Sequence, residues 1–94
     1  MKKINVFNEQ EVFGLRGLKN LAKLRAQTIG ACLTGNKKRR VAIEGQRGDF
    51  YSTRMNFYLD QERAGTLRNV DARKKAVWQM HESRHLKATL ENSL

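Results

Sequence analysis

Residues 41–58, VAIEGQRGDFYSTRMNFY, decide the fold, because their pattern favours two strands but the second half, Phe50 to Tyr58, can also form a helix. Val41-Ala42-Ile43 is a short apolar run of strand type, and Gly45-Gln46-Arg47-Gly48 has the residue types of a turn. The segment from Phe50 to Tyr58 is rich in aromatic and β-preferring residues. We therefore predict a β-hairpin over this stretch.

A helix is the competing interpretation of the segment from Phe50 to Tyr58. It would begin at a cap on Ser52 or Thr53 and would use Met55, Leu59 and Leu67 as its apolar face. Periodicity alone does not separate a strand from a helix in so short a segment, so the alternative stays open at this point.

A long helix is predicted upstream of the hairpin. Asn8 followed by Glu11 has the spacing of a capping box, and Phe7 and Val12 stand where a hydrophobic staple would lie. Gly35 is a plausible residue for the end of this helix, although Gly30 could mark a kink or an earlier end. Apolar residues recur at helical spacing to form its stripe: Leu15, Leu18, Ala22, Ile29 and Leu33, widened by Leu21 and Cys32.

One or two helices are predicted after the hairpin. Asp60 to Arg68 looks helical but contains Gly65, and a second helix from Ala72 to about Glu91 would be capped by Asp71. The resulting fold class is α+β, with a long N-terminal helix, a β-hairpin and one or two C-terminal helices. A winged-helix-like arrangement with the hairpin as the wing stays open. The length of 94 residues predicts a single small basic domain over residues 1–94.

The charge is the strongest indication of function. Nineteen Lys and Arg against nine Asp and Glu give a net charge of +10, which favours a polyanionic partner. The longest apolar stretches, such as residues 29–33, are far too short to span a bilayer, and the apolar residues at the N-terminus are too few for a signal peptide. Cys32 is the only cysteine, and we expect a buried, inert thiol. These observations predict a cytoplasmic protein without a membrane partner.

The basic run that precedes the hairpin is the first candidate binding site. With Arg47 and Arg54, it would lie at the start, the turn and the outer face of the hairpin, where cations can contact phosphates. The run comprises Lys37, Lys38, Arg39 and Arg40.

The C-terminal helix carries the second candidate site. Lys74, Trp78, His81 and His85 share one helical face, separate from the side that bears Met80. Trp78 is the only tryptophan, and it either packs in the core or forms an exposed anchor that stacks on a base or fills a pocket of a protein partner. Cations surround it in the sequence at Arg73, Lys74 and Lys75.

The same helix resembles the zincin signature over five residues, His81-Glu82-Ser83-Arg84-His85. Such a resemblance implies that two histidines bind zinc while the glutamate acts as the general base. The extended zincin motif then has a glycine and a third ligand, and here Ala88 and Glu91 occupy those places. We therefore predict no enzyme activity, no metal site and no cofactor.

The sequence thus predicts a non-enzymatic accessory or regulatory protein that binds nucleic acid, with DNA and RNA both open. The alternative is a small basic modulator or inhibitor of mobile-element type, which docks on an acidic surface of a host nucleic-acid enzyme. The oligomeric state is open, and a homodimer is compatible with the sequence.

Overall fold

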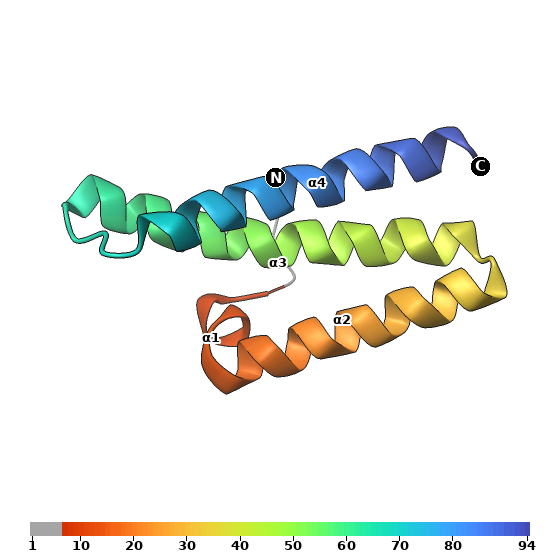
Figure 1. Cartoon of the computed structure of the whole chain (residues 1–94), viewed down its shortest axis with the longest axis horizontal. Coiled ribbons are helices and arrows are strands. Elements are labelled where there is room, and N and C mark those ends of the chain that lie inside the picture. The colour runs from red at the N-terminus through yellow and green to blue at the C-terminus, as the bar shows by residue number, and fades with distance from the viewer. Residues whose placement is uncertain (1–6) are drawn as a thin grey trace, which may run out of the picture.

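The computed structural model describes residues 7–94, which form four helices and no strand. The longest helix runs through the middle of the molecule, with one long helix on either side of it (Figure 1). In chain order the helices are α1 (Glu9–Val12), α2 (Gly14–Thr34), α3 (Lys37–Ala64) and α4 (Val70–Asn92).

The predicted β-hairpin is wrong, because residues 41–58 lie inside the single helix α3. Its cap is Asn36, whose side chain accepts a hydrogen bond from the Arg39 backbone N–H at 3.0 Å, well before the Ser52 or Thr53 of the helical alternative. The four consecutive residues Phe50 to Thr53 are all buried. Because α1, α2 and α4 all pack on α3, this helix lacks the single apolar face that normally identifies a helix in a sequence. The predicted α+β class and the winged-helix-like arrangement both required the hairpin, so they are wrong as well.

Small residues bring α3 and α4 together along an antiparallel contact. A Cβ atom at Gly48 would lie in ordinary van der Waals contact with the side chains of Ser83 and Arg84, and one at Gly45 would lie against Lys87. The residue numbers rise along α3 as they fall along α4, which fixes the register. The two glycines that suggested a turn thus serve the contact between two helices.

The N-terminal helix is broken where a continuous one was predicted. The capping box at Asn8 and Glu11 is confirmed, with both hydrogen bonds at 3.1 Å. However, Phe13 adopts an extended conformation and separates α1 from α2. Gly17 allows α2 to pack closely against the end of α1. A Cβ atom at this position would lie only 2.5 Å from the backbone carbonyl of Val12, so a larger residue would not fit.

The predicted apolar stripe of α2 faces outward. Leu15, Leu18, Ile29 and Leu33 are 85, 63, 61 and 82% exposed, and the Cys32 thiol, expected to be buried, is also exposed. The residues of α2 that are buried instead are Gly17, Leu24 and Ala31. The end of α2 is as predicted, because Gly35 takes the left-handed conformation with a φ of 67°.

The C-terminal helix agrees with its prediction except at its cap. α4 covers the predicted span within two residues at its start and one at its end, but Asn69 caps it, accepting a hydrogen bond from the Ala72 backbone N–H at 2.9 Å. Gly65 ends α3 in the left-handed conformation, so the helix that was expected across it stops there.

The core lies where α3 meets the other three helices. Phe50 is fully buried, and its ring meets that of Phe7 edge to face at 5.4 Å between centroids. Other buried apolar residues complete the cluster: Val12, Leu24, Ala31, Ile43, Tyr51 and Met80.

Two expectations concern the membrane. None of the helices within residues 7–94 combines the length and the apolar character needed to cross a bilayer. The expectation about a signal peptide depends mostly on residues 1–6, which lie outside the described part of the chain.

Candidate nucleic-acid interface

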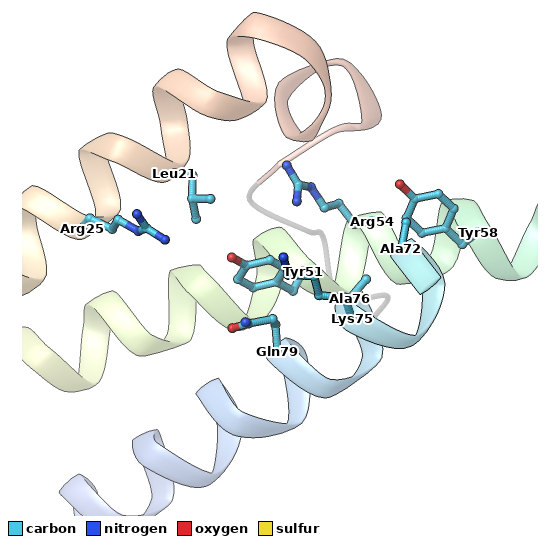
Figure 2. Close-up of a pocket in the computed structure, with 9 residues that line it drawn as sticks. All are labelled: Leu21, Arg25, Tyr51, Arg54, Tyr58, Ala72, Lys75, Ala76 and Gln79. Atoms are coloured by element: carbon cyan, nitrogen blue, oxygen red, sulfur yellow. The ribbon is translucent and has the colours of Figure 1, made fainter. Parts of the chain in front are cut away.

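A groove of about 260 Å³ lies between α2 and α4, with α3 as its floor. Three cations from three different helices line it: Arg25 from α2, Arg54 from α3 and Lys75 from α4 (Figure 2). Tyr51 and Tyr58 contribute phenol groups from the floor. The remaining lining residues are Leu21, Ala72, Ala76 and Gln79, so the lining contains no carboxylate. We call this site the central groove.

The floor of the central groove continues a row of arginines along α3. Arg40, Arg47 and Arg54 are seven residues apart, which places them on one face of the helix at intervals of about 10.5 Å. Tyr51 and Tyr58 fall on the same face. Three of the cations predicted as binding residues therefore share a face, although the hairpin that was expected to present them does not exist.

Arg54 is held in place by its neighbours. Its Nε donates a hydrogen bond of 2.7 Å to the backbone carbonyl of Val12, and its guanidinium lies 4.7 Å from the centroid of the Phe50 ring. The rings of Phe13 and Tyr51 are each 5.8 Å from the guanidinium carbon. A guanidinium fixed in this way offers its remaining N–H groups to an anion with little loss of side-chain entropy.

Two other predicted binding residues are engaged by carboxylates. Arg47 forms hydrogen bonds of 3.0 and 3.3 Å with the carboxylate of Glu44, which is buried. The Arg73 Nε lies 3.5 Å from the carboxylate of Glu62, which is close enough for an ion pair. The orientation of the two groups does not meet the geometry of a hydrogen bond. The charges of Arg47 and Arg73 are thus paired with carboxylates of the same chain, which leaves them less available to an external anion.

The outward face of α4 is as predicted. Lys74, Trp78, His81 and His85 are all exposed, whereas Met80 is buried on the opposite side. Trp78 is 60% exposed, so the interpretation of a core tryptophan is wrong. An exposed indole beside Lys74 is a surface on which a base can stack.

Lys75 joins this face to the central groove. It lines the groove, and it stands one residue after Lys74 and three before Trp78, which places it between the groove and the outward face of α4. Within residues 7–94, no ion pair engages Lys74 or Lys75. Both lysines are therefore available to a polyanion between the groove and Trp78.

The basic run lies at the start of α3, away from the groove. Lys37, Lys38 and Arg39 occupy the first turn, where the helix dipole makes cations unfavourable. The Lys37 Nζ lies 3.5 Å from the carbonyl of Ser93 at the end of α4, and Lys38 and Arg39 are exposed. Lys75 of α4 lies level with the middle of the second half of α3, as the antiparallel register requires. At a rise of 1.5 Å per residue, the basic run is about 25 Å from that level along the axis of α3.

Sequence reasoning missed several lining residues of the groove. Leu21 was assigned to the apolar stripe of the N-terminal helix, and Arg25 and Gln79 had no role. Arg25 alone among the cations of α2 lines the groove, and no spacing in the sequence relates it to Arg54 or Lys75. A contact between three separate helices is needed to bring these residues together.

The segment that resembles the zincin signature lies on the surface of α4. His81 and His85 are exposed, and Glu82 is half-buried. No three His, Cys, Asp or Glu side chains among residues 7–94 lie together as a metal-binding group.

Comparison with known proteins adds no assignment: no protein-family model, curated protein or solved structure matches this chain.

Proposed function

We propose that this protein binds nucleic acid, with phosphates in the central groove and a base on Trp78. The observation that carries the proposal is the convergence of Arg25, Arg54 and Lys75 from three helices on a groove whose lining has no carboxylate. An exposed tryptophan next to the groove supplies a second, sequence-tolerant contact. Phosphate contacts position the nucleic acid, so the interaction is expected to depend little on sequence.

Fluorescence anisotropy with labelled duplex DNA, single-stranded DNA and RNA tests the proposal at 50 and 200 mM salt. Each phosphate contact contributes about 0.9 to the slope of log affinity against log salt for duplex DNA. Arg25→Gln and Lys75→Gln should each weaken binding and reduce that slope by about 1. Lys23→Gln is the matched control, because it removes the same charge from α2 but lines a different hollow on the other side of the helix. An equal effect of Lys23→Gln would overturn the assignment to the groove.

The role of Trp78 has its own test. Trp78→Ala should lower affinity for single strands by about 1–3 kcal/mol, the range measured for one stacked base. Because the side chain is 60% exposed, the substitution should leave the free energy of unfolding nearly unchanged. Binding should also quench the fluorescence of this single tryptophan. A variant that binds all three nucleic acids like the wild type would remove Trp78 from the interface.

A protein partner is the second function that an observation favours, since an exposed tryptophan is also a typical hot-spot residue at protein interfaces. This modulator hypothesis predicts weak binding to every nucleic acid, unaffected by Arg25→Gln and Lys75→Gln. It also predicts a stoichiometric complex with an acidic protein. The Trp78→Ala substitution should prevent formation of this complex.

A further inference from the structure

The outward face of α2 is an apolar stripe that nothing within residues 7–94 covers. Four large side chains, Leu15, Leu18, Ile29 and Leu33, are each more than 60% exposed. Taking roughly 180 Å² for a fully exposed leucine, they present about 500 Å², near the upper end of the largest apolar patch on a typical monomer, about 300–600 Å². We call this surface the α2 stripe.

The centre of the α2 stripe is hollow. Ala22, Ala26 and Gly30 follow one another at intervals of four residues and are all exposed, which makes a row of small residues between the large ones. A Cβ atom at Gly30 would meet nothing within 4 Å. Gly30 therefore has no packing role in the monomer, although a glycine inside a helix lowers stability by about 1 kcal/mol relative to alanine.

We propose that the α2 stripe binds the α2 stripe of a second copy of this chain, in an antiparallel pair. With a twofold axis at the level of residue 24, Leu15 meets the partner's Leu33, and Ala22 meets the partner's Ala26. Leu18 lies on the same flank of the helix face as Ile29 and therefore meets the partner's Ile29. The large residues toward the two ends of the stripe thus face large residues of the partner, and the alanines at its centre face alanines, as an isologous contact requires.

The area is that of a weak, reversible dimer. Two stripes of about 500 Å² bury about 1,000 Å² in total, which is the lower bound for a specific interface. The small central residues favour a helix as the occupant, because alanine and glycine let two helix backbones approach closely, whereas they add little to binding at a membrane surface.

The charges beside the stripe determine how salt affects the dimer. Four cations lie on α2, namely Arg16, Lys19, Lys23 and Arg25, and the helix contains no acidic residue. Pairing two such helices brings like charges together, so salt should strengthen the dimer by screening their repulsion. The dissociation constant should fall several-fold between 50 and 500 mM NaCl.

Sedimentation equilibrium of the full chain over 10–500 µM tests the proposal. The average mass should rise with concentration from 10.9 kDa toward twice that value, and more so at high salt. Ala26→Leu should fold, because Ala26 is exposed, yet should raise the dissociation constant at least about tenfold by filling the hollow at the centre of the contact. This variant exposes more apolar surface than the wild type. If the chain associated nonspecifically through such surface, the variant would associate more strongly than the wild type.

Two further variants complete the test. Leu18→Glu should raise the dissociation constant as Ala26→Leu does, whereas Val70→Glu, a change at an exposed apolar residue of α4, should leave it unchanged. In a Cys32→Ser background, Ala22→Cys with Ala26→Cys should form disulfide-linked dimers under mild oxidation. A wild-type chain that is monomeric at every salt concentration, or an Ala26→Leu variant that dimerises as well as the wild type, would overturn the proposal. Neither result would affect the nucleic-acid assays.

Discussion

Two glycines of α2 should respond in opposite ways to the same substitution. Gly17→Ala places a Cβ atom 2.5 Å from the backbone carbonyl carbon and oxygen of Val12, a residue that is fully buried. Backbone atoms cannot yield as a flexible side chain does, so α1 must move away from α2. The movement also strains the 2.7 Å hydrogen bond from the Arg54 Nε to the Val12 carbonyl oxygen.

The magnitude follows from these contacts. Overpacking costs about 1–3 kcal/mol and the loss of a charged hydrogen bond about 1.5–3 kcal/mol, against a gain of about 1 kcal/mol in helix propensity. Gly17→Ala should therefore destabilise the fold by about 1.5–5 kcal/mol. Gly30→Ala meets no atom and should stabilise it by up to about 1 kcal/mol, or about 4–8 °C in Tm for a domain of this size.

Urea unfolding followed by far-UV circular dichroism measures both changes. A low protein concentration keeps the chain monomeric, and the denaturant slope should be the same for both variants and the wild type. A Gly17→Ala variant as stable as the wild type would refute the close approach of α1 and α2 on which the described fold depends.

The remaining predictions concern buried polar groups and use the same urea assay. Ser83→Ala should leave stability unchanged or raise it by up to about 1 kcal/mol, because the buried Ser83 hydroxyl has no hydrogen-bond partner among residues 7–94, and a marked loss would reveal a partner. Arg47→Gln should cost about 2–3 kcal/mol, since it leaves the buried carboxylate of Glu44 without its cation. Arg63→Gln breaks an ion pair with Asp60 whose side chains are both mostly exposed, so it should change stability by less than about 0.5 kcal/mol, and equal losses for the two arginine variants would contradict this reasoning.

The helices that pack on one side only are the ones that could be predicted from the sequence. α4 contacts α3 alone among the described helices, so its outward face is mostly polar, with Val70 and Trp78 as its exposed large apolar residues, and the exposure of Lys74 and Trp78 follows from their spacing. α3 contacts three helices, so Phe50 to Thr53 are all buried and no outward face marks the helix. Strand propensity was then the strongest remaining signal, and tertiary packing overrides it.

In α2 the clearest apolar signal marks the surface. The spacing of Leu15, Leu18 and Ile29 is that of an amphipathic helix, but the buried side contains the smaller residues Gly17 and Ala31. Small residues allow close contact between helices while contributing little hydropathy, so the sequence pattern points to the wrong face. The error is informative, because a contiguous apolar patch on the surface of a small domain is typical of an interaction site.

The central groove and the α2 stripe border each other on α2, but the interactions proposed for them should respond to salt in opposite ways. Arg25 lines the groove, where screening by salt weakens its attraction to phosphate. The same screening relieves the repulsion between two copies of α2, whose cations have no acidic residue on that helix to offset them. Attraction to a polyanion and repulsion between like-charged helices therefore change in opposite directions as salt rises. A single salt series that records anisotropy and molecular mass should show binding to nucleic acid falling while self-association grows, and two readouts that move together would mean that one surface is responsible for both.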